Sequence, residues 1–458
     1  MQDYLLDISG DERSNTIMVV PTDMTLANTK IIEGMRFDTL DEWLAWQENL
    51  HFTSIELGLD RCKAVAEKMG LLTPEFTVVS VAGTNGKGSS VNMLSSILTN
   101  AGYKTGSYTS PHLIRYNERI CINGKQVGDE ELCASFNRID QARGDISLTY
   151  FEFGTLAAFD IFQREGINIA ILEVGLGGRL DAVNCLDADV ALITTIDMDH
   201  ENWLGNDRES IGREKAGIMR KSKPVISADA NPPQSVPSYA EEIGAIYYQA
   251  GKEYQYDITA DEMWNWYNSA RSFTKLSQPS LYNKKQISNA AGVLMVLTLL
   301  SEKFPVSDNA INKGFQEFFI IGRFQIVPDK AQLIIDVAHN RSAAALLVEN
   351  LKNLPIKGKT HVLIGMLKDK NRQAIFEVLS MIADVWHLVS LEGPRGAQAE
   401  TLCADLSALH ISKNVFSYEH VSRALDKIRE DISPEDRIVI TGSFLTVGAA
   451  IKHLNLHK

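Results

Sequence analysis

Hydrophobic positions along the chain fall into short continuous runs that alternate with amphipathic segments. The runs over residues 76–82, 169–174 and 190–195 are apolar and rich in β-branched residues. After the first run, residues 89–100 have a helical pattern that closes at Gly102. Apolar strands separated by helices are typical of a parallel sheet that is covered on both faces. The first half of the chain therefore predicts an α/β domain.

A second alternation of the same kind begins after about residue 325, and it predicts a separate open α/β domain of some 130 residues. The strands and helices that the pattern predicts there are strands 333–337, 361–365, 385–389 and 437–441, and helices 343–353 and 372–383. Helices are also predicted over 41–49, 59–69 and 288–301. Residues 222–282 mix prolines with tyrosines and tryptophans and give no clear pattern.

Composition excludes several classes of protein. A length of 458 residues suits two to three domains, and 45 Lys and Arg against 58 Asp and Glu give a net charge of −13. Such an acidic chain is not expected to bind nucleic acid without sequence preference. Its five widely spaced cysteines argue against a disulfide framework or a structural zinc site. The longest apolar run, 290–300, is too short for a bilayer, and the acidic N-terminus lacks a secretory pattern, so a cytoplasmic protein is expected.

The sharpest local signal is the glycine-rich segment VAGTNGKGS over residues 81–89, between a predicted strand and a predicted helix. Glycines let backbone N–H groups face a phosphate, and a helix N-terminus favours negative charge. Lys87 can reach terminal phosphates, and Ser89 can take a metal ion. The spacing departs from GxxxxGK[ST], because Gly88 separates these two residues. A glycine-rich turn with a helix cap is the alternative, but the strand-before, helix-after context favours phosphate binding.

Two further candidates follow predicted strands. Glu173 ends a buried run just before a glycine-rich turn, and ligands bind at this edge of open α/β sheets. A carboxylate there fits a magnesium ligand, although a helix cap or a salt bridge would use the same residue type. His200 follows Asp197 and Asp199 at the same edge, and the residues alone leave a ligand role and a structural role open.

Eleven segments in order resemble the Mur-ligase-like ATP-dependent amide ligases, and among them the bifunctional dihydrofolate synthase/folylpolyglutamate synthases, from about Leu40 to the end. These segments are SIELGLDR (54–61), AGTNGKGS (82–89), TSPHLIRYNERI (109–120), GDISLTYFEFGT (144–155), ILEVGLGGRLDAVN (171–184), DMDHENWLG (197–205), REKAGI (213–218), GRFQIV (322–327), DVAHN (336–340), LEGPRGA (391–397) and TGSFLTV (441–447). Some positions differ from the commonest family residues, with Ser89 for Thr, Glu56 for Asp, Thr109 for Ser and Phe153 for Tyr.

The resemblance implies an N-terminal P-loop ATPase domain (35–321) with a mostly parallel sheet, after an extension (1–34). A smaller C-terminal Rossmann-like α/β domain (322–458) would complete the ATP and glutamate site. The implied activity is ATP-dependent addition of L-glutamate to 7,8-dihydropteroate, and of further glutamates to tetrahydrofolate, through an acyl phosphate. A folylpolyglutamate synthase alone, a Mur-type ligase acting on a nucleotide-linked sugar peptide, and a nucleotide switch without ligation are the alternatives. The expected partners are small molecules, with no nucleic acid and no membrane, for a monomer.

The resemblance also assigns nucleotide and metal contacts. The implied ATP contacts are Thr84, Asn85, Gly86, Lys87, Asn289, Arg323 and Asp336, where a linker salt bridge and a helix cap are the alternatives for the last two. The implied ligands of Mg²⁺, with two ions expected, are Ser110, Glu173 and His200. Lys215 by itself predicts a surface lysine, but it matches a family lysine that is carbamylated and helps to hold the second ion. Lys87, Lys215 and His339 are the catalytic candidates, with His339 as a candidate base.

The dihydropteroate site implied by the resemblance comprises Ser54, Ile55, Glu56, Leu57, Thr149, Tyr150, Phe151, Glu152, Leu180, Asp181 and Ala182. Aromatic walls with a few polar groups suit a flat heterocycle, whereas the residues alone favour a helix face in the core for 149–152. Glu56 places its carboxylate one methylene farther out than Asp would. Arg395 fits a glutamate carboxylate and a loop salt bridge equally well.

Overall fold

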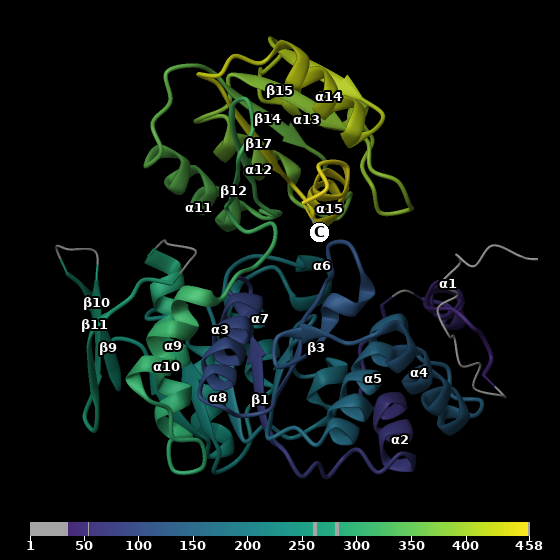
Figure 1. Ribbon diagram of the computed structural model, residues 1–458, viewed down its shortest axis with the longest axis vertical. Coiled ribbons are helices and arrows are strands. Elements are labelled where there is room, and N and C mark those ends of the chain that lie inside the picture. Colours follow the sequence, from purple (N-terminus) through teal and green to yellow (C-terminus); the bar gives the residue numbers. More distant parts are fainter. Residues whose placement is uncertain (1–34, 54, 260–262, 280–283, 457–458) are drawn as a thin grey trace, which may run out of the picture.

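The computed structural model describes residues 35–53, 55–259, 263–279 and 284–456, so the predicted extension 1–34 and Ser54 lie outside the described residues. The chain forms two bodies, one above the other in Figure 1. The lower body contains an eight-stranded and a three-stranded sheet, and the upper body contains a six-stranded sheet. In the described part of the chain, no helix is long and apolar enough to cross a bilayer.

The eight-stranded sheet is parallel apart from its β3–β4 edge, which confirms the predicted α/β fold. In spatial order its strands are β4 (Lys125–Gln126), β3 (Ile120–Ile122), β2 (Thr105–Tyr108), β5 (Ile169–Glu173), β1 (Thr77–Ala82), β6 (Val190–Ile193), β7 (Pro224–Ser227) and β8 (Ile246–Gln249). The central strands β5, β1 and β6 are buried along their whole length, because helices cover both faces.

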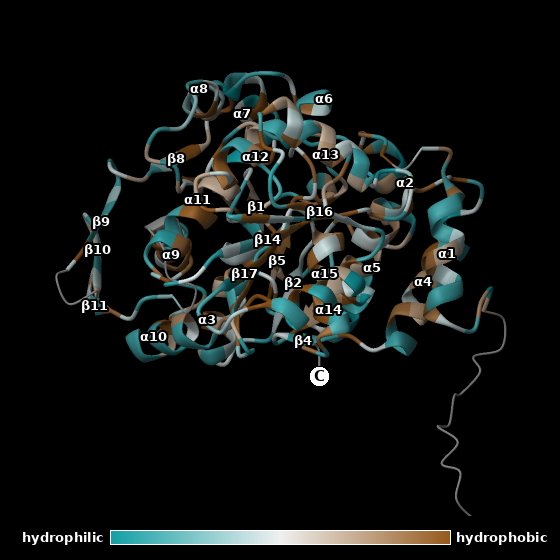
Figure 2. Cartoon of the chain, turned by 90° about the horizontal axis from the view of Figure 1, so that it is seen from above, coloured by the Kyte–Doolittle hydropathy of each residue, from teal (hydrophilic) through white to brown (hydrophobic). Residues whose placement is uncertain are grey.

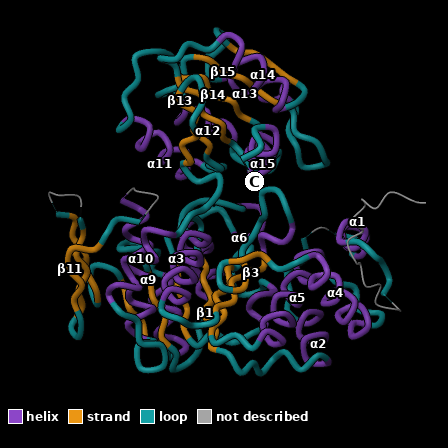
Figure 3. The backbone as a smooth tube through the Cα atoms, in the orientation of Figure 1, coloured by secondary structure: helices purple, strands orange, loops and turns teal. Residues whose placement is uncertain are grey.

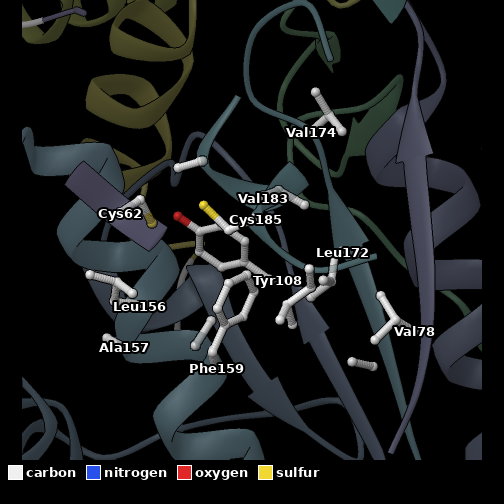
Figure 4. Close-up of a cluster of buried hydrophobic side chains, with 14 of the residues drawn as sticks. Cys62, Val78, Tyr108, Leu156, Ala157, Phe159, Leu172, Val174, Val183 and Cys185 are labelled. Atoms are coloured by element: carbon white, nitrogen blue, oxygen red, sulfur yellow. The ribbon is translucent and has the colours of Figure 1, made fainter. Parts of the chain in front are cut away.

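Alternate residues of each central strand enter two separate cores. On β1, Val78 and Ala82 face one core, and Val79 and Val81 face the other. The helices of the first core are α1 (Leu40–Leu50), α2 (Asp60–Lys68), α4 (Asp129–Arg143), α5 (Tyr150–Glu165), α7 (Arg208–Ala216) and α8 (Ser235–Ile243). Those of the second are α3 (Lys87–Asn100), α9 (Lys284–Leu299) and α10 (Asp308–Glu317). Figure 4 shows the first core around Tyr108.

The three-stranded antiparallel sheet occupies the region that gave no clear sequence pattern. It consists of β9 (Tyr254–Ile258), β10 (Trp264–Asn268) and β11 (Ser272–Leu276). The indole N–H of Trp266 donates a hydrogen bond to the carbonyl of Ala291 on α9 at 3.1 Å. The ring of Trp264 lies 5.7 Å from that of Phe315 on α10. Two buried tryptophans thus attach this sheet to the second core.

The six-stranded sheet of the upper body is parallel except for its edge strand β12. In spatial order its strands are β12 (Gln325–Val327), β13 (Gln332–Ile335), β17 (Arg437–Thr441), β14 (Thr360–Ile364), β15 (Val385–Val389) and β16 (Val415–Tyr418). One face packs against α11 (Arg341–Lys352), α12 (Arg372–Leu379) and α13 (Ala399–Ala408), and the other against α14 (Val421–Asp431) and α15 (Phe444–His453). Hydrophobic residues concentrate along the strands and hydrophilic ones on the outer helices (Figure 2).

The loops that follow β1, β2, β5 and β6 leave the same edge of the eight-stranded sheet. In Figure 3 the upper body sits above the lower one, with loops between the two. The short helix α6 (Glu201–Leu204) and the start of α15 lie in this region (Figure 1). Ligands bind at the carboxyl edges of parallel strands, so a binding site is expected at the interface between the two bodies.

Candidate active site

The glycine-rich loop after β1 has the backbone that its sequence predicts. Gly83 has φ +148°, and a Cβ there would lie 1.7 Å from the Oγ1 of Thr194. Gly86, with φ +93°, is the N-cap residue of α3 and has no side chain to cap it, so the first amides of that helix remain available to an anion. Lys87 folds back over the loop and donates hydrogen bonds to the carbonyls of Gly83 at 3.1 Å and Thr84 at 3.3 Å.

A cavity of about 80 Å³ lies beside this loop and is lined from both bodies. It brings together most of the predicted ATP contacts, namely Asn85, Gly86, Asn289, Arg323 and Asp336. Asp336 accepts hydrogen bonds from the backbone N–H groups of Phe324 and Ala338, both at 2.8 Å, so its carboxylate also braces its own loop. Thr84 lies outside this lining and braces the site, since its Oγ1 accepts from the N–H of Asp197 at 3.0 Å.

The predicted magnesium ligands lie at the end of the site nearest the loop. Glu173 is 6% exposed, and its Oε2 accepts a hydrogen bond from the N–H of Ser110 at 3.3 Å. No cation lies within ion-pair distance of this carboxylate among the described residues, and burial raises its pKa while Lys87 lowers it. A buried carboxylate without a paired cation fits a divalent ion.

His200 completes the predicted metal set and lines the same cavity as Ser110. Its backbone is left-handed, with φ +52°, and burial lowers its pKa to about 4. The imidazole is therefore neutral at pH 7, as a metal ligand must be. Across the described ranges no group of three or more His, Cys, Asp or Glu side chains is arranged to hold a metal. A metal here would accordingly also need the oxygen of Ser110.

Lys215 is buried, so the surface-lysine interpretation is wrong. It is 5% exposed on α7, and its Nζ donates a hydrogen bond to the carbonyl of Gly83 at 2.9 Å. Burial, followed by the charge of Lys87, lowers the pKa of Lys215 to about 7. The amine therefore lies against the glycine-rich loop and is partly neutral at physiological pH.

A larger cavity of about 610 Å³ is lined by all the predicted dihydropteroate residues that the structure describes. The ring of Phe151 packs against Gly175, where a Cβ would lie 2.6 Å from it. Glu152 is 2% exposed and caps α5, with Oε2 accepting from the N–H of Thr149 at 2.8 Å. Burial raises the pKa of Asp181 to about 7 even though two backbone N–H groups donate to its carboxylate. The segment 149–152 is thus both a helix start and a cavity wall.

Glu56, the residue that replaces a family Asp, is held by the protein itself. Its carboxylate accepts from the Nε2 of His51 at 2.7 Å and from Arg61. These contacts, led by the hydrogen bond from His51, lower its pKa. Arg61 also donates to Glu152 at 3.1 Å, so one arginine links two carboxylates of the cavity wall.

Asp199 connects the two bodies through partners that no local sequence pattern indicates. Its carboxylate receives Lys370 Nζ at 2.6 Å and Asn340 Nδ2 at 3.1 Å, and the Nε2 of His339 lies 3.5 Å away. His339 donates from Nδ1 to the carbonyl of Val337 at 3.0 Å, which leaves Nε2 as its basic atom. His339 and Lys370 both line the larger cavity.

Arg395 forms the salt bridge that its sequence allowed. It pairs with Asp369, in the loop that follows β14, at 3.2 Å and also lines the larger cavity, and a contact with a glutamate carboxylate stays a prediction. Residues Ser443, Phe444 and Leu445 line the cavity as well, although the motif TGSFLTV had suggested no role for them.

The arrangement defines a class of enzyme, and comparisons with known proteins agree. Residues 81–297 match the Mur ligase middle domain, and residues 322–444 match the Mur ligase glutamate ligase domain. The chain is thus an ATP-dependent ligase of the Mur ligase group.

Curated relatives narrow the class further. The Escherichia coli (strain K12) dihydrofolate synthase/folylpolyglutamate synthase is 43% identical over 92% of this chain and 96% of its own length. The Bacillus subtilis (strain 168) protein of the same name is 31% identical over 87% of this chain and 95% of its own length. The chain belongs to the dihydrofolate synthase/folylpolyglutamate synthase family.

Solved structures show the same relationship. E. coli FolC in complex with DHPP and ADP has a TM-score of 0.86 and 44% identity, covering 91% of this chain and 98% of that one. A bifunctional folylpolyglutamate synthase/dihydrofolate synthase with Mn, AMPPNP and L-glutamate bound has a TM-score of 0.84 and 42% identity, with the same coverage. Members of the family thus bind adenine nucleotides and a divalent metal.

Proposed function

We propose that this ligase joins L-glutamate to 7,8-dihydropteroate and then adds further glutamates to tetrahydrofolate, with ATP as the energy source. The observation that carries the proposal is the continuity of the site. A phosphate-binding loop, a buried unpaired carboxylate and a cavity of about 610 Å³ with an aromatic wall meet at one sheet edge, under residues of the second body. The relatives' names and bound ligands support this choice of substrates.

An amine does not form an amide directly with a carboxylate, because oxide would have to leave. The carboxylate must therefore be activated first. Transfer of the γ-phosphoryl group to the acceptor carboxylate gives an acyl phosphate, and the glutamate amine then attacks its carbonyl carbon. The amide forms, phosphate leaves, and the amine loses a proton. Lys87 and the first amides of α3 hold the phosphates in this reaction. His339 Nε2 is the atom we assign to receive the proton, because its Nδ1–H is engaged by Val337.

Magnesium would be held by Ser110, Glu173 and His200, where it neutralises phosphate charge. Lys215 as a carbamate would supply a further carboxylate beside the loop for a second ion. Asn289, Arg323 and Asp336 would contact the nucleotide from the smaller cavity. The dihydropteroate ring would lie against Tyr150 and Phe151 in the larger one.

In this proposal the two bodies bind different parts of the substrates. The unit 35–321 holds phosphates and the pterin, and the unit 322–458 closes over the nucleotide and the incoming glutamate through residues such as Lys370 and Arg395. Because one chain supplies both units, we propose a monomer, which analytical ultracentrifugation checks.

Phosphate release and product chromatography test the function. Phosphate is measured with ATP alone, then with dihydropteroate, and then with glutamate added. Steady release that requires all three, with dihydrofolate as product, is the expected result. Elongation of a tetrahydrofolate without dihydrofolate formation would indicate a folylpolyglutamate synthase alone. Phosphate release that depends on neither the acceptor nor glutamate would indicate a nucleotide switch.

A further inference from the structure

Arg119 carries a buried guanidinium charge that forms no salt bridge with the described residues. It ends the short helix η1 (Tyr116–Arg119), is 8% exposed and lines the larger cavity. Within the described ranges no carboxylate lies within ion-pair distance of its guanidinium. The adjacent Glu118 is turned away, because its carboxylate accepts the N–H groups of residues 113–115 at 2.7–2.8 Å. Burying an unpaired cation is costly unless a ligand supplies the opposite charge.

The immediate neighbours of Arg119 are neutral. Its Nε donates to the Nδ1 of His112 at 2.8 Å, which requires that nitrogen to be unprotonated. The guanidinium carbon lies 5.3 Å from the centre of the Tyr116 ring and 5.6 Å from that of Tyr150. Ring faces hold the plane of the guanidinium in place but do not neutralise it. The side chain is therefore oriented and still lacks a counter-ion.

The other cations of the larger cavity already have partners. Lys370 pairs with Asp199 at 2.6 Å, and Arg395 pairs with Asp369 at 3.2 Å. Among the described Lys and Arg side chains that line this cavity, Arg119 alone lacks a carboxylate. An anionic group that enters the cavity thus finds one unpaired guanidinium.

The position of Arg119 indicates which anion this is. Arg119 packs against Tyr150, an aromatic residue of the cavity wall. It also donates a hydrogen bond to His112, which lies two residues after Ser110, a proposed metal ligand that lines the same cavity. An elongated acceptor with a heterocycle at one end and a carboxylate at the other would pass the guanidinium where its carboxylate approaches the phosphate loop.

We propose that Arg119 binds the reacting carboxylate of the acceptor, an aryl carboxylate on a heterocyclic arm, and presents it to the phosphate loop. This inference rests on the proposed function and adds to it the residue that holds the group to be phosphorylated. A planar guanidinium binds a carboxylate with defined geometry, and its charge offsets the repulsion between that carboxylate and the γ-phosphate. The hydrogen bond from Nε to His112 keeps the guanidinium group from rotating.

The test compares two ligands that differ in one charge. Binding of 7,8-dihydropteroate and of its carboxamide is measured by calorimetry, with ADP and magnesium present, for wild type, Arg119→Met and Arg119→Lys. We expect Arg119→Met to weaken the acid about 10- to 100-fold and the amide less than about 2-fold. The affinity of Arg119→Lys for the acid should fall between those of wild type and Arg119→Met, because lysine keeps the positive charge but lacks the planar guanidinium group. A rise in the acceptor KM, with the ATP KM unchanged, should accompany the loss.

A matched control is Arg143→Met. Arg143 is also 8% exposed and stacks on an aromatic ring, Trp46, at 5.1 Å, but it lies outside both cavities. Its loss should leave the preference for acid over amide unchanged. If both variants bind the acid and the amide equally more weakly, or if neither variant binds either ligand more weakly, the inference about Arg119 is overturned. The proposed function still stands in that case if the wild-type protein ligates dihydropteroate. Failure of wild type to bind or ligate dihydropteroate contradicts the proposed function itself.

Discussion

Carbamylation of Lys215 is the prediction that depends most directly on the observed environment. Carbon dioxide adds only to a neutral amine. A lysine with the ordinary pKa of 10.5 is neutral in about one molecule in 3,000 at pH 7, whereas a pKa of about 7 makes about half of the Lys215 side chains neutral. Burial therefore raises the reactive fraction on the order of a thousandfold. Because the pKa is lowered, that fraction grows as pH rises through 7.

The assay uses ¹³C-bicarbonate and NMR. Wild type with magnesium and a non-hydrolysable ATP analogue should show a carbamate signal that increases from pH 6 to pH 8 and is absent from Lys215→Ala. Lys223→Ala is the control, since Lys223 is half-exposed and paired with Asp189 at 2.8 Å, and it should retain the signal. Ligase activity should fall at least about 100-fold in Lys215→Ala, because the carboxylate for the second ion is lost.

Chemical rescue separates a carboxylate from a cation. Acetate should restore part of the activity of Lys215→Ala, and methylamine should restore none. Rescue by methylamine, or a wild-type spectrum without a Lys215-dependent signal between pH 6 and 8, would show that Lys215 acts as an ammonium group.

Three further substitutions test separate parts of the site. Lys87→Ala should keep its melting temperature and lose most ligase activity in steady-state assays, and a near wild-type rate would exclude the phosphate-loop assignment. Phe151→Ala should raise the KM for dihydropteroate more than that for ATP, and equal changes would indicate that the ring only fills the core. The pKa of Asp181 rises from 3.8 to about 7 on folding, so the free energy of unfolding should fall by up to about 4 kcal/mol as pH rises from 4 to 7. Asp181→Asn should flatten that decline in urea unfolding, and an unchanged slope would refute the shift.

The parallel strands were predictable because both of their faces are buried. The runs 76–82 and 169–174 correspond to β1 (Thr77–Ala82) and β5 (Ile169–Glu173) within a residue. The sheet β9–β11 was not predictable in the same way. It buries one face, so Trp264 and Trp266 alternate with exposed or half-buried polar positions, and the pattern resembles a loop.

In the candidate site, some residues could be predicted from local sequence and others could not. The positions of Lys87 and Glu173 could be predicted from local sequence, because a helix start places the first and a strand end places the second. The contact between Asp199 and Lys370 joins residues 171 positions apart, and neither neighbourhood indicates the other. The burial of Lys215 was likewise invisible, since its neighbours Arg213 and Glu214 are typical of an exposed helix face.

Contacts between the two bodies fix the glycine-rich loop and the loop after β6 against the second body. Asn85 of the phosphate loop donates to Ser342 at 2.7 Å, and Asp199 pairs with Lys370 at 2.6 Å. Asp199 and Lys370 are both below 10% exposed, so their attraction offsets a desolvation cost that disappears when the bodies separate. Such a pair adds little net stability, but removing either partner would leave the other charge buried and unpaired. If the two bodies close during the proposed reaction, these contacts would align the loop with the cavity at the same time as water is excluded.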